Sequence, residues 1–303
     1  MRKSLFRVFF YILLFWSGGG LGKPAWAQNA QRPLILGISH VAFRVKDLTK
    51  TTDFYQGLLG YKAIRISKTG NRQEHINFSV NTRQHIEIYP GLPAGQDERM
   101  LEVAFEVTDA NAMRLYLLGK GVKVPETLEQ EPAGTLSFVV QDPEKHLIKF
   151  IQHGVKKKNK GSLNVKHESA VSDRILHVGI TVSDVKNADA FYQDILGFSE
   201  IWRGGRPDNV TNWINMKVPE GTDYVEYMLV SGQVNRQQLG VLHHVALQVP
   251  SIQNALDVLR NRVNNSAPDV IEAPRIGRNN RWQLNLYDPE GTRVELMEPF
   301  PMR

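Results

Sequence analysis

A strand-like segment with one pattern occurs four times along the chain, and this repeat limits the possible folds more than any other feature of the sequence. In each copy the second residue, which we call the key position, is followed by a Val and then by a small residue. The copies are SHVAFRV from Ser39, LEVAFEV from Leu101, LHVGITV from Leu176 and HHVALQV from His243. Because side chains alternate along a strand, each small residue shares a face with the key residue and should leave room for a ligand beside it. These small residues are Ala42, Ala104, Gly179 and Ala246.

Each copy is followed by a polar turn, an amphipathic helical pattern and further short strands. The sequence therefore predicts four βαβββ modules of roughly 50 to 60 residues, which are too small to bury a core alone and should pair. The first and third modules share FYQGLLGY from Phe54 and FYQDILGF from Phe191. These motifs are as far apart as His40 and His177, which indicates a duplication. The second and fourth modules share Asp-Pro turns before their last strands, at Asp142-Pro143 and Asp288-Pro289.

The first 27 residues have the layout of a secretory signal peptide. A charged start containing Arg2, Lys3 and Arg7 precedes the apolar run 8–16, and Ala25-Trp26-Ala27 forms a cleavage site. The apolar run is shorter than the roughly 20 residues that a transmembrane helix needs. We therefore expect an exported protein, periplasmic or secreted, that has no membrane span after cleavage.

The repeat and the polar stretches between its copies predict the domain limits. We expect a signal peptide at 1–27, an N-terminal pair of modules at 28–154, a Lys-rich linker at 155–173 and a C-terminal pair at 174–303. The net charge of +6 falls to +2 when the four cationic residues of the signal peptide are removed, so nothing favours a nucleic-acid partner. The chain has no cysteine, so any metal ion must be held by His and carboxylate ligands.

Together these motifs resemble the vicinal oxygen chelate superfamily, which includes glyoxalase I, extradiol dioxygenases, epimerases and antibiotic-sequestering proteins. The resemblance covers residues 35 to 300 and includes the DPEGTRVEL segment from Asp288. It implies an α+β fold in which four βαβββ modules pair into two open barrel-like cups. It also implies metal ligands on the first and last strands of each module. It does not fix the reaction, because this fold serves many.

In the C-terminal cup the resemblance places metal ligands at His177, Glu226, His244 and Glu295. The strand alternation agrees, because each lies on the face opposite its apolar neighbours. These residue types suit a divalent ion such as Fe, Mn, Zn, Ni or Co. His243 is one step out of phase, so we expect it to face the packing side and to have a structural role.

In the N-terminal cup the same positions read His40, Glu87, Glu102 and Lys149. A carboxylate replaces the second His, and an ammonium group replaces the last Glu. The charge of Lys149 would repel a divalent cation, and we expect it to pair with Glu87 or Glu102. The N-terminal half is thus predicted to be structural or to support a homo-oligomer, with binding of a non-metal ligand as the alternative. A metal ion is expected only in residues 174–303.

Two His and two carboxylates predict a metal-dependent enzyme of glyoxalase or epimerase type. Such a lyase or isomerase would bind a small substrate through adjacent oxygens, and Glu226 would be its catalytic base.

Two alternatives remain open. An extradiol-type Fe(II) dioxygenase would use His177, His244 and Glu295. Two features argue against the dioxygenase. Glu226 would crowd the ion, and the resembling dioxygenases usually have a further His where this chain has Arg-Asn-Asn at 278–280. In the other alternative the cup binds a small molecule without turnover, and its pocket would be lined by Trp202, Trp213, Trp282 and Tyr224.

Overall fold

The computed structural model describes residues 31–68, 73–131, 134–154, 169–263 and 271–302. The expected signal peptide at 1–27 and most of the expected linker lie outside these ranges. Among the described residues, none of the helices combines the length and the apolar character needed to cross a bilayer.

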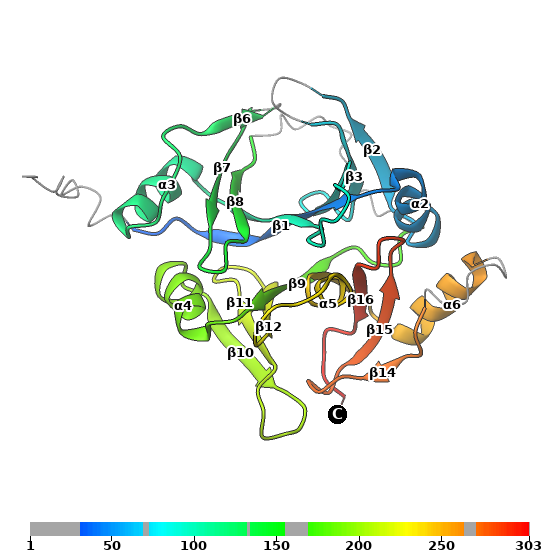
Figure 1. Cartoon of the computed structure of the whole chain (residues 1–303). Helices are drawn as coiled ribbons and strands as arrows, with labels where there is room; N and C mark the ends of the chain where they lie inside the picture. The colour runs from blue at the N-terminus through cyan, green and yellow to red at the C-terminus, as the bar shows by residue number, and fades with distance from the viewer. Residues whose placement is uncertain (1–30, 69–72, 132–133, 155–168, 264–270, 303) are drawn as a thin grey trace, which may run out of the picture.

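The chain forms two eight-stranded sheets, and each curls into an open cup with helices on its outer side (Figure 1). The strand orders are β2-β3-β4-β1-β5-β8-β7-β6 and β10-β11-β12-β9-β13-β16-β15-β14, so the two halves have the same topology. The predicted α+β fold of four modules in two cups is confirmed.

The N-terminal sheet consists of β1 (Ile35–Val45), β2 (Lys62–Ile66), β3 (His75–Ser79), β4 (His85–Pro90), β5 (Met100–Val107), β6 (Glu129–Glu131), β7 (Thr135–Gln141) and β8 (Leu147–Gln152). The C-terminal sheet consists of β9 (Ile175–Val182), β10 (Ser199–Gly204), β11 (Trp213–Lys217), β12 (Tyr224–Leu229), β13 (His244–Gln248), β14 (Arg275–Ile276), β15 (Trp282–Tyr287) and β16 (Arg293–Met297). The helices are α2 (Leu48–Thr52) with its π-helical continuation η1 (Asp53–Leu58), α3 (Ala110–Gly119), α4 (Val185–Asp189) with η3 (Ala190–Ile195), α5 (Arg236–Leu242) and α6 (Ile252–Arg262).

The first strands of the two modules lie at the middle of each sheet. They pair antiparallel, β1 with β5 and β9 with β13. The last strand of each module then pairs in parallel with its own first strand, for example β12 with β9 and β16 with β13. First and last strands are therefore neighbours at the floor of each cup, where the predicted ligands lie.

Alternation along these strands separates a packed face from a cup face. In β9, Val178, Ile180 and Val182 are buried in a cluster that includes Phe191 and Tyr192 of η3. This cluster extends through both halves of the chain. One of its links is the edge-to-face contact of Phe105 with Phe198, whose ring centroids are 5.3 Å apart.

The two Asp-Pro turns contact the opposite half of the molecule. The carboxylate of Glu144 accepts hydrogen bonds from the backbone N–H groups of Ser183 and Asp184 at 2.6 and 2.9 Å, where α4 begins. Glu290 accepts from Lys46 and Asp47 at 2.7 and 3.2 Å, where α2 begins. Each carboxylate therefore satisfies N–H groups at a helix start in the other half.

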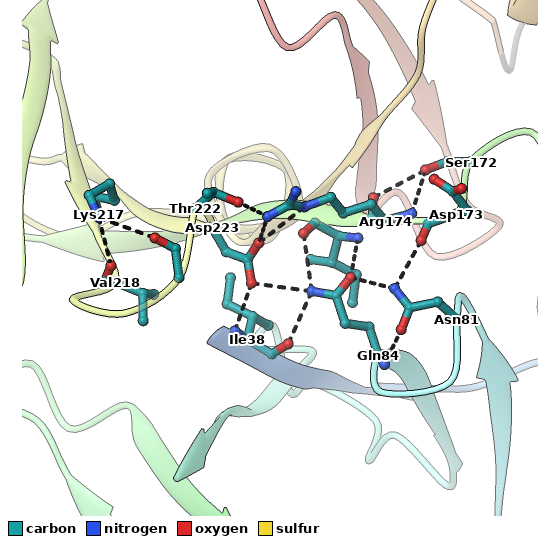
Figure 2. Close-up of polar contacts among 12 residues, drawn as sticks. Ile38, Asn81, Gln84, Ser172, Asp173, Arg174, Lys217, Val218, Thr222 and Asp223 are labelled. Atoms are coloured by element: carbon teal, nitrogen blue, oxygen red, sulfur yellow. Dashed lines mark hydrogen bonds and ion pairs between the residues drawn. The ribbon is translucent and has the colours of Figure 1, made fainter. Parts of the chain in front are cut away.

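A buried polar network also joins the two halves (Figure 2). The Gln84 side chain accepts from the N–H of Ile175 at 2.9 Å and donates to the carbonyls of Ile38 and Ile175 at 3.1 and 3.2 Å. The Asp223 carboxylate accepts from the N–H of Ile38 at 3.0 Å and from Arg174 Nε at 3.2 Å. Burial raises the pKa of Asp223, although the charge of Arg174 opposes this.

Replacing Gln84 by Ala should leave the buried N–H of Ile175 and the carbonyl of Ile38 without this partner. We expect the free energy of unfolding to fall by about 1 to 3 kcal/mol, measured by urea denaturation followed by circular dichroism. The exposed Gln56 supplies the control, because Gln56→Ala removes the same side chain from a solvated position. Equal losses in the two variants would show that the network does not stabilise the contact between the halves.

Candidate metal centre

Strand register brings the four predicted ligands to one patch of the C-terminal cup. His244 of β13 lies opposite Gly179 of β9, and Glu226 of β12 pairs with the same glycine from the other side. His177 lies opposite Ala246, which pairs with Glu295 of β16. Each ligand therefore has another ligand one or two strands away on the same face.

The ligand atoms are close enough to share one ion. His177 Nε2 and His244 Nε2 are 3.0 Å apart. Glu226 Oε2 lies 3.7 and 3.4 Å from these two nitrogens, and Glu295 Oε2 lies 3.8 and 3.6 Å from them. Two ligands at about 2.1 Å from an ion, at angles of 90 to 109°, would be about 3.0 to 3.4 Å apart. The observed separations thus fit a divalent ion at the centre after small adjustments.

The protonation states of the two imidazoles also suit metal binding. His244 Nδ1 lies 3.0 Å from the carbonyl of Leu242, which fixes the proton on Nδ1 and leaves the Nε2 lone pair facing the centre. Burial lowers the pKa of both His177 and His244 well below the usual value, although Glu226 opposes this at His177. Burial raises the pKa of Glu295 to about 7, with Arg293 opposing and Glu226 reinforcing the rise. The imidazoles are therefore neutral, as metal ligation requires.

The small residue of the third module serves a different purpose from the one expected. A Cβ added to Gly179 would lie 2.1 Å from two atoms of the His244 imidazole. The space beside His177 is thus filled by the second imidazole and not by a ligand. His177 is held from another side by Tyr224, whose ring stacks on it with centroids 4.5 Å apart.

Arg293 is a site residue to which the sequence analysis gave no role. Its Nη2 lies 2.8 and 2.9 Å from the two nitrogens of the His244 ring and 4.0 Å from Glu295 Oε2. Because the proton lies on Nδ1, Nε2 is the ring nitrogen that can accept a hydrogen bond from this guanidinium. The sequence could have indicated this role, because residues two apart on a strand share a face and Arg293 precedes Glu295 by two residues on β16.

A pocket of about 370 Å³ opens above the ligands. Trp202 and Trp213 line it as expected, whereas Trp282 packs against the core and Tyr224 is buried behind His177. Four arginines also line the pocket, at positions 206, 275, 278 and 293. Its walls are therefore aromatic and cationic, and its floor carries the carboxylates of Glu226 and Glu295.

His243 is directed away from this pocket. Its Nδ1 lies 2.8 Å from Glu98 Oε1 in the N-terminal half, and its Nε2 lies 3.0 Å from the hydroxyl of Thr181. These contacts give His243 a place in the packing between the halves.

In the N-terminal cup Lys149 pairs with Glu102, one of the two alternative partners expected, and also with Glu131. Its Nζ lies 3.6 Å from Glu102 and 3.0 Å from Glu131. Glu102 also lies 3.3 Å from Nε2 of His40, so the position of the second His is occupied by a carboxylate that contacts both an ammonium group and an imidazole.

Comparison with known proteins gives one family and one fold. The model of the Glyoxalase/Bleomycin resistance protein/Dioxygenase superfamily matches residues 37–150 and 174–296. A search of curated protein sequences finds no significant match.

Solved structures with a similar fold include three dioxygenases. The 2,3-dioxygenase LapB from Pseudomonas sp. KL28 has 17% sequence identity and a TM-score of 0.65, over 89% of this chain and 96% of that chain. Homoprotocatechuate 2,3-dioxygenase from Brevibacterium fuscum, in complex with 3,4-dihydroxyphenylacetate, has 19% identity and a TM-score of 0.66, over 92% and 83%. The enzyme of the same name from Arthrobacter globiformis has 20% identity and a TM-score of 0.66, over 90% and 82%. At these identities the likeness concerns the fold.

His244→Ala should remove one tightly bound ion per chain, because it deletes a nitrogen at the centre of the ligand set. His243→Ala should leave the ion count unchanged, since that side chain contacts Glu98 and Thr181. Elemental analysis of the purified, reconstituted proteins measures both. Equal loss of metal from the two variants would contradict the assignment of His244 by strand phase.

Proposed function

Since the chain belongs to the Glyoxalase/Bleomycin resistance protein/Dioxygenase superfamily, we propose that it is a metal-dependent enzyme acting on a small anionic substrate that chelates the ion through two adjacent oxygens. The observation that carries this proposal is the convergence of His177, His244 and Glu295, whose ligand atoms all lie within 4.8 Å of one another. Two His and one carboxylate with open positions are typical of non-haem Fe(II) oxygenases.

Ring cleavage of a catechol by an extradiol-type dioxygenase is the reaction that these findings favour. This reverses the order expected from sequence, in which proton transfer came first. The support is the compact set of two His and one Glu, together with the fold shared along most of the chain with 2,3-dioxygenases. A ferrous ion in this set would supply binding positions for a catechol and for O₂ and would relay electrons from the catechol to O₂.

The charge around the centre favours an anionic substrate. Glu226 and Glu295 contribute two negative charges and Arg293 one positive charge, so a divalent ion would leave the centre with a net positive charge. An ionised catechol, or a catechol with a carboxylate side chain, would offset this charge. Trp202 and Trp213 on the pocket wall provide aromatic surface for its ring.

Proton transfer of glyoxalase or epimerase type is the second candidate, and Glu226 is the observation that favours it. Its Oε2 is as close to the two imidazole nitrogens as that of Glu295, so it can act as a fourth ligand or as a base beside a chelated substrate. Arg278 and Asn279 line the pocket in the region where a further His is usual in extradiol dioxygenases. In this reaction Glu226 would accept the α-proton of a hydroxycarbonyl compound, while the neutral imidazoles hold the ion.

We propose further that the enzyme works outside the cytoplasm. The layout of residues 1–27 supports this proposal. We also propose the domain limits that the repeat predicts, 28–154 and 174–303.

Two assays on one preparation distinguish the candidate reactions. Protein reconstituted anaerobically with Fe(II) should consume O₂ when it is given catechols in aerated buffer. An oxygen electrode records the rate, and the catechols tested include 3,4-dihydroxyphenylacetate. The second assay measures by NMR whether the α-proton of a hydroxycarbonyl compound exchanges with D₂O. Exchange without O₂ consumption would favour the proton-transfer reaction. An ion-loaded protein with neither activity would contradict both assignments.

Glu226→Gln tests the role of that carboxylate while preserving its shape. If Glu226 is the base, turnover should fall by about 10² to 10⁴-fold and the ion should be retained by His177, His244 and Glu295. Unchanged or faster O₂ consumption in Glu226→Gln would show that Glu226 is not the base. His177→Ala is the control that should lose both the ion and the activity.

A further inference from the structure

The N-terminal cup contains a second convergence of imidazoles and a carboxylate, which joins two of the positions expected from sequence, His40 and Glu87, to a residue that was not expected, His85. The ligand atoms of His40, His85 and Glu87 all lie within 4.8 Å of one another. His40 on β1 pairs in parallel register with His85 on β4, and Glu87 follows His85 by two residues on the same face. All three therefore point into the cup.

Glu87 lies at the centre of this cluster. Its Oε1 is 3.0 Å from His85 Nε2 and 3.8 Å from His75 Nε2, and its Oε2 accepts a hydrogen bond from the hydroxyl of Tyr89 at 2.8 Å. The carboxylate is only 3% exposed. The separation from His85 lies within the range of about 3.0 to 3.4 Å expected between two ligands of one ion, and the separation from His75 would have to shorten by about 0.4 Å.

His75 is prepared as a nitrogen donor. Its Nδ1 lies 2.9 Å from the carbonyl of Gln73, which fixes the proton on Nδ1 and directs the Nε2 lone pair inward. The residue is fully buried, and Nε2 has no hydrogen-bond partner among the residues that the structure describes. A buried lone pair that faces a carboxylate is unfavourable unless a proton or a cation lies between the two.

Lys149 does not exclude a cation from this cluster. Although burial opposes it, the carboxylates of Glu102 and Glu131 hold the pKa of Lys149 above its usual value, so the ammonium is charged. Its ion pairs among the described residues are with those two carboxylates, at 3.6 and 3.0 Å, and Glu87 contributes to the raised pKa only through its charge. Three carboxylates and one ammonium leave two negative charges in the cup when the imidazoles are neutral, which is the charge that one divalent ion offsets.

We propose that the N-terminal cup binds a second divalent ion, of the class of Zn²⁺, through His40, His85 and Glu87, with His75 as the adjacent fourth donor. His and carboxylate ligands suit such an ion, and a set of four protein ligands is typical of an ion that holds structure and not of one that binds substrate. This replaces the expectation that metal binds only in residues 174–303.

The C-terminal cup offers a matched substitution for the test. Tyr224 occupies there the position of His85, since both precede a Glu by two residues and pair with the first His of their half. His85 stacks on His40 with centroids 4.7 Å apart, as Tyr224 stacks on His177 at 4.5 Å. His85→Tyr should therefore keep a stacked ring and remove the nitrogen ligand.

The experiment counts Zn²⁺ ions in the full-length protein by elemental analysis after equilibrium dialysis. Wild type should bind two ions per chain, and the double variant His244→Ala with Glu295→Gln should bind one. Adding His85→Tyr to that double variant should abolish the remaining ion, and so should adding Glu87→Gln. His146→Gln is the control, because His146 is a half-buried imidazole of the same half that makes hydrogen bonds with Asp142 and Thr181 and packs against His243, away from Glu87. It should leave the count unchanged.

The proposal is overturned if the double variant binds no Zn²⁺, or if its single ion survives both His85→Tyr and Glu87→Gln. Circular dichroism of each variant establishes that it is folded, and Glu87→Gln carries the test if His85→Tyr does not fold. Because the counts are made with the C-terminal ligands removed, their outcome is independent of the reaction assigned to that cup.

Discussion

The antiparallel pairing of β9 with β13 is the contact on which the candidate active site depends. It sets His177 of one module beside His244 of the next, and their Nε2 atoms are 3.0 Å apart. Neither module has a complete ligand set, because each contributes one imidazole and one carboxylate. The absence of a side chain at Gly179 allows this approach, since any Cβ there would overlap the second imidazole. Two buried imidazoles and two buried carboxylates are costly without a counter-charge, so the surrounding sheet has to hold them in place.

The two cups show how one scaffold can present different chemistry. Position by position, β16 carries Glu295 where β8 carries Lys149, and β12 carries Tyr224 where β4 carries His85. Glu226 and Glu87 occupy the same position in both halves. The donors of the C-terminal cup come from the first and last strands of both modules, whereas those proposed for the N-terminal cup gather on β1, β3 and β4 of one module. The fold therefore fixes where a side chain points, and the residue at each position decides what the cup can bind.

Contacts between the halves are built from the same repeat. Glu144 and Glu290, each the residue after an Asp-Pro pair, satisfy N–H groups at helix starts in the opposite half. The aspartates of these turns are buried beside them, and Asp142 accepts a hydrogen bond from the hydroxyl of Tyr192 at 2.9 Å. Burial raises the pKa of Asp288 to about 6, although the N–H groups of Thr292 and Glu290 oppose the rise. A motif that reads as a local turn thus also connects the two cups.

The sequence by itself determined the four modules, their pairing into two halves and the shared face of His177, Glu226, His244 and Glu295. It could do so because the twofold alternation of a strand assigns each side chain to a face before any long-range contact is known. Only the tertiary structure decided which side chains from different strands meet on that face. It placed Arg293 against His244, His85 and His75 around Glu87, and Glu144 at the start of α4. These contacts depend on strand register and on the packing of distant segments, which the pattern within one strand does not specify.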